Sequence, residues 1–408
     1  MRALLATAGS RGDVEPVQAL AAKLVEAGHD TLLAASPDFQ ESSAELGIPY
    51  LPMGIDVQAA IREHAETLSG RPLRFLRALE RLFRAEISKH FGKLMEAGRG
   101  VDVIVGAALE SAAPSVAEAL DIPYRYALFS PLGHRTRQHA PWLFTWQRLP
   151  GWANRLVWAA TEGMLDRLFL PRINLHRRRL RLAPVRYSSR YVLGRRPFLA
   201  ADAPLAAMPT DVRTPVVQTG AWRLPARGRL PKEIDEFIEA GEPPVYIGFG
   251  SMVQTAPERT FAVVRDAVGL AGVRAVVSAG WTDMDSGVLD ERCLGIGSVP
   301  HAILLPKMAA TVHHGGAGTT SAALRAGVPQ IVVPHMFDQA YWGERVRQEG
   351  LGPPPVPARA MTAPRLAEAI RSCVDDQEMR ARARAIGMDV SKVDGAAAAV
   401  RELERDHG

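Results

Sequence analysis

The sequence has 408 residues, of which 47% are hydrophobic, and a formal net charge of +5, so it is long and apolar enough for two domains with separate cores. No apolar run approaches the ~18 residues that cross a bilayer, and the run at residues 3–8 is too short for a signal peptide, which favours a cytoplasmic protein. The charge gives no sign of nucleic-acid binding, and two cysteines, Cys293 and Cys373, are too few for a disulfide framework and lack zinc-site spacing.

The first half of the sequence predicts alternating strands and helices. An apolar strand at residues 3–8 leads into a turn, a helical apolar period covers residues 16–27, and residues 31–35 predict a second strand. Farther along, the expected elements are a helix at 72–97, a strand at 101–105, a helix at 111–120 and a strand at 124–129. Such alternation predicts a parallel sheet covered by helices.

A second α/β series begins near Pro243. Its expected elements are strands at 245–249, 273–279 and 330–333, a helix at 257–271 and a glycine-rich turn at 312–320. Between the two series, residues 200–231 are rich in Pro and Gly and lack a sustained period. We therefore expect a first domain at 1–212, a linker at 213–231 and a second domain at 232–384.

The most informative segment is the octet 313–320, His-His-Gly-Gly-Ala-Gly-Thr-Thr, between an apolar run and a helix-compatible run. A strand, a glycine turn and a helix start form a geometry that holds phosphate, because glycine lets the backbone approach and the helix N–H groups face the anion. His314 can donate a hydrogen bond to a phosphate oxygen. The alternative is a turn that only packs, which the combination of histidines, glycines and threonines disfavours.

Other polar and aromatic residues follow strands of the second half, where ligands of doubly wound sheets bind. Asp338 and Gln339 could hold the vicinal hydroxyls of a sugar, although Asp also caps helices. Ser251 could face the same crevice or only form a turn. Trp281 and Val299 could flank a base or serve as core and turn residues.

The turn at residues 9–13, Gly-Ser-Arg-Gly-Asp, occupies the end of the first strand. It lacks the third glycine of a dinucleotide fingerprint, which disfavours an NAD-dependent oxidoreductase. Asp13 could be a general base, or the N-cap of the helix expected from Pro16. Spacing alone leaves both readings open.

An aromatic segment and a basic segment follow. The aromatic residues are Trp142, Phe144, Trp146, Trp152 and Trp158. They could line a pocket for an apolar acceptor, touch a membrane surface or pack in a core. The basic run at 176–179 predicts a solvated helix face, with an anionic contact as the alternative.

Residues 1–16 resemble the N-terminus of the bacterial glycosyltransferases that decorate glycopeptide and related antibiotics, and residues 299–339 look like the donor-binding signature of the same family. That family also includes sterol and macrolide glucosyltransferases and plant enzymes that use UDP-sugars. The resemblance covers nearly the whole chain and is weakest at 132–231. It implies an α/β GT-B fold, in which the first of two Rossmann-like domains binds the acceptor, the second binds the nucleotide sugar across a cleft, and a last helix, about 385–408, packs back on the first.

The resemblance also implies roles for single residues. Asp13 matches the proposed base, Ser251 a phosphate contact and Val299 a contact to the nucleotide base. His314, Gly316, Gly318 and Thr319 match diphosphate contacts, and Asp338 and Gln339 match sugar-hydroxyl contacts. Where the plant motif has a glutamate for the ribose, this chain has Ala322, so the choice between UDP and dTDP is open.

We therefore expect an inverting glycosyltransferase without a metal or cofactor that moves a sugar from a UDP- or dTDP-sugar to a hydroxyl of an apolar natural product such as a polyketide or macrolide. Candidate acceptor contacts are Ser10, Trp142, Phe144 and Trp146, and a transient contact with a membrane surface is open. A sterol or lipid glucosyltransferase is the first alternative. A nucleotide-sugar epimerase or hydrolase, and a non-catalytic helper protein, are alternatives from other classes.

Overall fold

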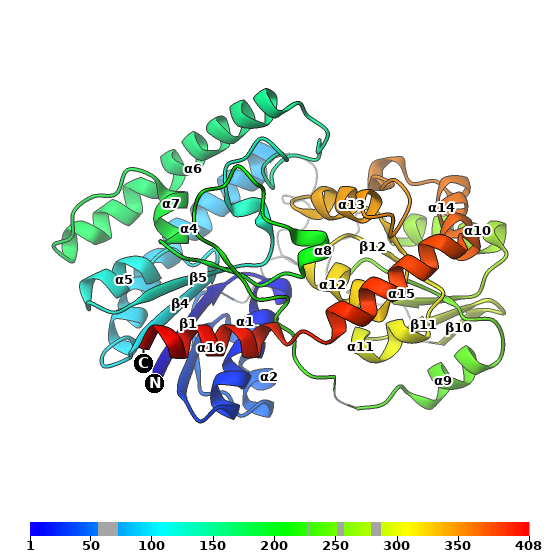
Figure 1. Cartoon of the computed structure of the whole chain (residues 1–408), viewed down its shortest axis with the longest axis horizontal. Coiled ribbons are helices and arrows are strands. Elements are labelled where there is room, and N and C mark those ends of the chain that lie inside the picture. Colours follow the sequence, from blue (N-terminus) through cyan, green and yellow to red (C-terminus); the bar gives the residue numbers. More distant parts are fainter. Residues whose placement is uncertain (56–71, 227, 251–256, 279–286, 408) are drawn as a thin grey trace.

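The computed structural model describes residues 1–55, 72–226, 228–250, 257–278 and 287–407. Two α/β units lie side by side along the long axis of the molecule, and the two termini lie next to each other on the first unit (Figure 1). Each unit has its own sheet, with helices on both faces.

The first sheet has seven parallel strands in the order β3-β2-β1-β4-β5-β6-β7. The strands are β1 (Arg2–Ala8), β2 (Asp30–Ala35), β3 (Tyr50–Pro52), β4 (Val103–Ala108), β5 (Tyr124–Leu128), β6 (Phe198–Leu199) and β7 (Val217–Gln218). The order reverses between β1 and β4, so the carboxyl ends of these two strands form the crevice where ligands of such sheets bind. The first sheet also reaches into the expected linker, because β7 lies within 213–231.

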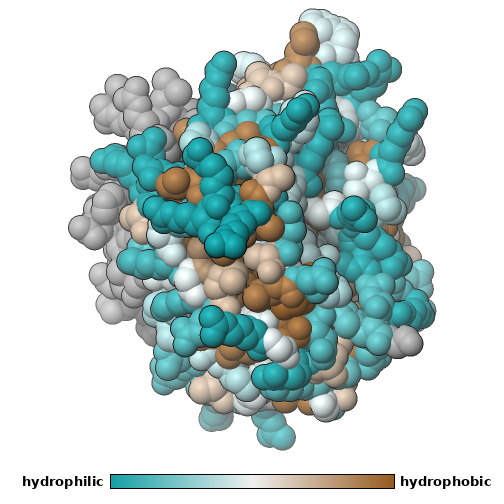
Figure 2. Space-filling model, turned by 90° about the vertical axis from the view of Figure 1, so that its left-hand side faces the viewer, coloured by the Kyte–Doolittle hydropathy of each residue, from teal (hydrophilic) through white to brown (hydrophobic). Residues whose placement is uncertain are grey.

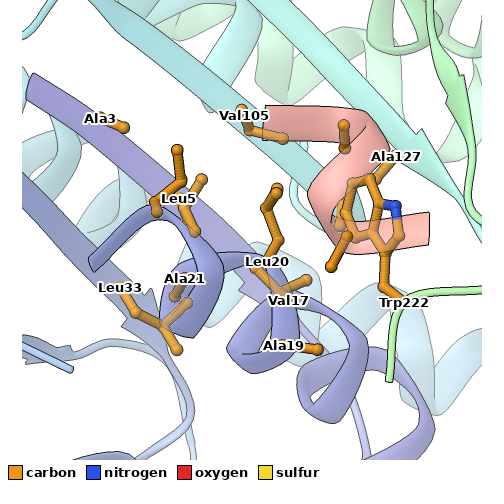
Figure 3. Packing of buried hydrophobic residues seen from close by; sticks show 14 of the residues in the cluster. Ala3, Leu5, Val17, Ala19, Leu20, Ala21, Leu33, Val105, Ala127 and Trp222 are labelled. Atoms are coloured by element: carbon orange, nitrogen blue, oxygen red, sulfur yellow. The ribbon is translucent and has the colours of Figure 1, made fainter. Parts of the chain in front are cut away.

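Helices cover both faces of this sheet because side chains of β1 alternate between two cores. Ala3 and Leu5 join the core beneath α1 (Arg11–Glu26), whereas Leu4 and Ala6 join the core beneath α4 (Pro72–Ala97) and α5 (Ala113–Ala119). Figure 3 shows Leu5 beside the α1 side chains of the first core. The other helical elements of this unit are η1 (Pro37–Phe39), α2 (Gln40–Glu45), η2 (Pro131–Gly133), α6 (Gly151–Arg179), α7 (Ser188–Leu193) and α8 (Ala203–Ala206).

The second sheet has six strands in the order β10-β11-β9-β8-β12-β13, all parallel to their neighbours except β10. The strands are β8 (Val245–Gly248), β9 (Ala275–Ser278), β10 (Gly287–Asp290), β11 (Cys293–Ile296), β12 (Ala310–His313) and β13 (Gln330–Val332). The order reverses between β8 and β12, and the glycine-rich turn directly follows β12. The expected phosphate-binding turn therefore lies at the crevice of this sheet.

The helices of the second unit include one that starts from the glycine-rich turn. It is α12 (Ala317–Ala326), and Gly327 ends it in the left-handed conformation that glycine adopts most readily. The others are α9 (Lys232–Glu239), α10 (Pro257–Ala271), α11 (His301–Leu304), η3 (Leu305–Lys307), α13 (Gln339–Gln348), η4 (Ala358–Ala360), α14 (Ala363–Asp375) and α15 (Gln377–Ser391).

The chain crosses between the units twice, and the two crossings touch. The first passes Gly220, and the second leads from α15 into α16 (Gly395–His407), which returns to the first unit and packs on α1. A Cβ atom on Gly395 would lie 2.3 Å from the carbonyl oxygen of Gly220, so the two backbones meet where no side chain fits. Trp222 lies beside α16 in the same core (Figure 3).

A buried ion pair joins the units next to these crossings. The carboxylate of Asp202, which precedes α8, accepts hydrogen bonds from Nη2 and Nε of Arg325 on α12 at 2.6 and 2.9 Å, and both side chains are buried. It also accepts from Ser321 Oγ at 2.7 Å and from the Ala221 N–H at 3.0 Å. This pair fixes α12 relative to the first unit.

The surface of the first unit is mostly hydrophilic at the end that lies on the left in Figure 1, with smaller apolar areas between charged side chains (Figure 2). Only half of the basic run at the end of α6 is exposed, which corrects the expectation of a solvated helix face. Arg178 and Arg179 are exposed, but His176 and Arg177 are buried, and Arg177 pairs with Glu118 at 2.7 Å. None of the described helices has both the length and the apolar character needed to cross a membrane.

Replacing Leu403 of α16 by alanine is expected to lower the free energy of unfolding by about 2–5 kcal/mol, because a fully buried leucine would leave a cavity between α16, α1 and the sheet. Urea unfolding measures this change. Met388→Ala on α15 is the control, since Met388 is 67% exposed. Equal effects of the two substitutions would contradict the packing of α16 on the first unit.

Candidate active site

Asp13 lies in the first turn of α1, and the structure corrects where that helix begins. The helix starts at Arg11 rather than at Pro16, which lies inside it, and its N-cap is Ser10 rather than Asp13. Asp13 Oδ2 accepts hydrogen bonds from the Ser10 N–H at 2.8 Å and from Ser10 Oγ at 3.2 Å. This reciprocal arrangement is a capping box, which holds the carboxylate at the carboxyl end of β1.

Gly9 makes room for this carboxylate. A Cβ atom at position 9 would lie 2.2 Å from Asp13 Oδ2, so no other residue fits without moving the acid. From the sequence, Gly9 was predicted only as part of a turn. The Ser-x-x-acid pattern directly after it was the available signal, because that spacing is typical of a capping box.

The surroundings of Asp13 favour a strong base. Burial raises the pKa of Asp13, and the two hydrogen bonds from Ser10 oppose that shift only in part. Both hydrogen bonds go to Oδ2, and Oδ1 has no partner among the described residues. One oxygen is therefore held in place while the other remains free to accept a proton.

The two histidines of the glycine-rich turn have different surroundings. His313 is fully buried; its Nδ1 accepts the Gly315 N–H at 3.0 Å and its Nε2 lies 3.0 Å from Gln330 Oε1. These contacts require a neutral ring with the proton on Nε2, and burial lowers the pKa of His313 to about 4. His313 therefore shapes the turn from inside the sheet, a role that the sequence analysis did not separate from that of His314.

His314 faces the crevice between two glycines. A Cβ atom on Gly250 would lie 2.9 Å from its Cε1, and one on Gly316 would lie 2.5 Å from its Nε2. Burial lowers the pKa of His314 to about 3, and neighbouring histidines add to that shift. His314 is thus neutral at ordinary pH, and its Nδ1 is buried without a partner among the described residues.

The first turn of α12 is open. Gly316 is the N-cap and has no side chain to bond the free N–H groups, while Thr320 Oγ1 bonds back to the Gly316 carbonyl at 2.9 Å. Gly318 is exposed, and a Cβ atom there would meet no protein atom within 4 Å. Thr319 is half-buried beside it. Packing does not require glycine at 318, so the space above it is free for a ligand.

The segment after β13 carries the second acid. Phe337 has a φ of +54°, which is uncommon for a residue other than glycine, and Asp338 follows as the N-cap position of α13. Asp338 Oδ2 accepts the Trp342 Nε1–H at 2.9 Å. Gln339 Oε1 accepts the N–H groups of His335 and Met336 at 2.8 and 3.0 Å, so this oxygen is bound within its own loop.

Asp13 and Asp338 come together across the cleft between the units. Burial and, to a smaller extent, the negative charge of Asp13 raise the pKa of Asp338 to about 6. The same cleft contains a hollow lined by Gly12 of α1 and by Gly318 and Ser321 of α12. The structure therefore brings Asp13 and Asp338, predicted from the two halves of the sequence, close to each other and to the start of α12.

The aromatic segment does not form one cluster. Trp158 packs in the interior, whereas Trp146 and Trp152 are 65% and 68% exposed. Trp142 is half-buried, with its ring 5.8 Å from that of Phe337 in the loop before Asp338, and Phe144 is also half-buried. Of the aromatic candidates, Trp142 is thus the one that reaches the second unit.

The remaining sequence candidates are placed as follows. Ser251 and Trp281 lie outside the described residues. Val299 is half-buried between β11 and α11, and Ala322 is buried in α12. Within the described part of the chain, no three His, Cys, Asp or Glu side chains gather in a way that could hold a metal ion.

Comparisons with known proteins identify the family. Residues 3–135 match the family described as glycosyltransferase family 28 N-terminal domain, and residues 284–401 match the erythromycin biosynthesis protein CIII-like C-terminal domain. A vancomycin aglycone glucosyltransferase of Amycolatopsis orientalis is 37% identical over 99% of this chain and 97% of its own length. The chain belongs to this glycosyltransferase family. A dTDP-epi-vancosaminyltransferase of the same organism is 38% identical over 86% of the chain.

Solved structures confirm the GT-B fold of this glycosyltransferase. The glycosyltransferase of kitacinnamycin superimposes with a TM-score of 0.76 at 19% identity, covering 99% of this chain and 98% of its own. The glycosyltransferase VinC, solved in complex with dTDP, superimposes with a TM-score of 0.71 at 22% identity, covering all of both chains. The expected fold class and enzyme class are therefore confirmed.

Acid is expected to destabilise the glycosyltransferase, because buried histidines remain neutral in the fold. Burial lowers the pKa of four of them to about 4 and that of a fifth to about 3; the five are His134, His139, His301, His313 and His314. In the unfolded chain each binds a proton near pH ~6.5, so the unfolded state binds more protons below that pH. Each such histidine then removes about 1.4 kcal/mol of unfolding free energy per pH unit, down to its folded pKa.

Urea unfolding from about pH 7.5 to about pH 5 measures this loss. The raised pKa values of Asp13 and Asp338 act in the opposite direction, but they are fewer. A stability that stays constant over this range would contradict the neutral state of the buried histidines.

Proposed function

We propose that the chain transfers a sugar from a UDP- or dTDP-sugar to a hydroxyl group of an apolar natural product, with inversion at the sugar carbon and without a metal. The observation that carries this proposal is the meeting of Asp13 with Asp338 and the open first turn of α12 at one cleft. A base, a sugar-binding acid and an anion-binding helix end are the groups that such a transfer needs.

The donor site is assigned to the second unit. The free N–H groups at the start of α12, together with Gly316, Gly318 and Thr319, would hold the diphosphate, because the amino end of a helix attracts an anion. His314 would add a hydrogen bond but no charge, since its lowered pKa keeps it neutral. The related vancosaminyltransferase is named for a dTDP-sugar, and VinC was solved with dTDP, which supports this class of donor.

The remaining donor contacts follow from the same placement. Val299 would contact the nucleotide base from the loop before α11, and Ser251 and Trp281 are retained as proposed contacts from the sequence. Asp338 would bind sugar hydroxyls through the oxygen that does not accept the Trp342 N–H. Gln339 would contribute through its amide nitrogen, because its oxygen is bound to the loop backbone.

Asp13 would act on the acceptor. A hydroxyl placed against its free oxygen would lose its proton as it attacks C1 of the sugar from the side opposite the diphosphate, which departs toward α12. A base placed in this way contributes of order ~10²–10⁴-fold to the rate. Hydrogen-bond donors already aligned at the leaving group lower the activation barrier by about 3 kcal/mol each, because they need not reorganise as charge develops.

The acceptor is proposed to be large and apolar. Trp142 lies half-buried beside Phe337 of the loop that carries Asp338, Phe144 is half-buried two residues farther along the chain, and Ser10 lies beside the base. The exposed Trp146 would contact a part of the acceptor that extends from the cleft. A sterol 3-beta-glucosyltransferase of Komagataella phaffii is 30% identical over 99% of this chain but only 34% of its own length. The vancomycin aglycone glucosyltransferase is matched over nearly its full length, which favours a natural product over a sterol as the acceptor.

Incubating UDP- and dTDP-sugars with the enzyme and a panel of polyketide and macrolide alcohols tests the proposal by mass spectrometry of the products. The expected result is a glycosylated acceptor whose anomeric configuration is opposite to that of the sugar in the donor. Release or conversion of the sugar in the absence of an acceptor, with no transfer in its presence, would assign the chain to the hydrolase or epimerase class.

Asp13→Asn is expected to lower kcat by about 10²–10⁴-fold with little change in donor affinity. The amide oxygen can still accept both hydrogen bonds from Ser10, so α1 keeps its cap while the base is lost. In the unmodified enzyme, the rate should fall as the pH drops through the raised pKa of Asp13. Steady-state kinetics measure both effects, and unchanged turnover in this variant would remove Asp13 from its role.

Gly318→Ala is expected to weaken UDP or dTDP binding by at least about tenfold, or 1.4 kcal/mol, because the new methyl group would occupy the open space above α12. The melting temperature should not fall, since alanine favours a helix over glycine. Gly316→Ala should lower both affinity and stability because its Cβ would collide with His314. Gly269→Ala, at an equally open position on α10, is the control. If calorimetry finds that Gly318→Ala binds UDP and dTDP as tightly as this control does, the proposed diphosphate site is wrong.

A further inference from the structure

Arg223, in the first crossing between the units, is a half-buried cation held in a fixed place. The preceding residue, Trp222, is only 3% exposed and donates from Nε1 to Thr219 Oγ1 at 2.9 Å. Its ring packs against those of Phe129 and Phe198 at 6.4 and 5.8 Å, so the backbone that carries Arg223 is anchored in the first core. No role for Arg223 was predicted from the sequence, because a single arginine in a linker is not part of a recognisable motif.

Arg223 lines the hollow between the units together with Gly12 of α1 and with Gly318 and Ser321 of α12. It therefore reaches the open first turn of α12 from the opposite side. Burial lowers the pKa of His301, the first residue of α11, and the charges of Arg11 and Arg223 add to that shift. The guanidinium is thus near enough to His301 to act on it while it lines the hollow beside α12.

This guanidinium forms no hydrogen bond or ion pair with the described part of the chain. Asp202 lines the same hollow, but both of its oxygens are occupied by four hydrogen bonds, two from Arg325 and one each from Ser321 and Ala221. Burial and the positive charge of Arg325 lower the pKa of Arg223, and the negative charge of Asp202 offsets these effects only in part. The hollow therefore keeps an excess of positive charge that an anion would balance.

We propose that Arg223 binds the diphosphate of the nucleotide sugar and stabilises the charge that this group gains as it leaves. The assignment rests on the proposed function above. The planar guanidinium can donate two parallel hydrogen bonds to two non-bridging oxygens, a geometry that lysine cannot reproduce. With α12 on one side and Arg223 on the other, the diphosphate is held from both units.

The test compares ligands that differ only in phosphate. In Arg223→Gln, calorimetry should find UDP and dTDP bound about 10- to 100-fold more weakly, while uridine and thymidine change by less than about twofold. Arg223→Lys should lose an intermediate amount of affinity for the diphosphates, because lysine keeps the positive charge but lacks the two parallel N–H donors of the guanidinium. Arg229→Gln, an exposed arginine of the same linker, should bind all four ligands as the unchanged protein does.

Two outcomes would overturn the assignment. Unchanged affinity of Arg223→Gln for both diphosphates would show that the guanidinium does not touch them, and an equal loss for nucleosides and diphosphates would make Arg223 a structural residue. If Arg223→Gln also lowers the melting temperature, the affinities of Arg223→Lys for the diphosphates and the nucleosides decide whether Arg223 contacts the phosphates. If the unchanged protein binds neither UDP nor dTDP, the proposed function itself fails, which is a separate result.

Discussion

The buried carboxylate of Asp202 determines where the two units meet. It belongs to the first unit, yet Arg325 and Ser321 of α12 donate three of the four hydrogen bonds that it accepts. Removing one partner of such a pair typically costs about 3–5 kcal/mol, because the other charge remains buried and unpaired. Since α12 also presents the glycine-rich turn, the same contact that joins the units places the anion-binding end of this helix opposite α1 and Asp13.

The electrostatics of the cleft follow from burial more than from any single pair. Burial raises the pKa of both facing acids, Asp13 and Asp338, and lowers that of His314. All three shifts move these groups toward their neutral forms, which low-dielectric surroundings favour. A diphosphate entering the cleft would therefore interact with helix N–H groups and a neutral imidazole, and Arg223 would add a full positive charge. In the proposed mechanism, Asp13 would accept the proton and the start of α12 with Arg223 would hold the anion.

The sequence predicted the parts of this structure that depend on local pattern. Apolar runs and periods identified most of the strands and the helices α1, α4, α5 and α10, but not the long α6, and the octet 313–320 identified the turn at the second crevice. The start of α1 was wrong because Pro16 favours the first position of a helix, whereas the Ser10–Asp13 capping box starts this one earlier. The short strands β10 and β11 were missed because four residues carry too little periodicity.

Contacts between distant residues could not be predicted. The Asp202–Arg325 pair spans 123 positions, and the surroundings of Arg223 come from both units. The aromatic residues from Trp142 to Trp158 were considered together because they are close in sequence, but the loop and the helix direct them to different surroundings. Residue identity was sufficient to propose Asp13 and Asp338 separately; only the fold brings them to the same cleft.

The contact between Gly220 and Gly395 has a mechanical consequence. The two segments that connect the units touch there. The Asp202–Arg325 ion pair lies beside both segments, because Asp202 accepts the Ala221 N–H and Arg325 donates to the Val393 carbonyl at 2.9 Å. The units are also joined through α13, where Arg345 donates to the carbonyl oxygens of Leu205 and Pro204 and Glu344 pairs with Arg148. A change in the angle between the units would have to break these α13 contacts, and sliding would separate the touching backbones at Gly220 and Gly395.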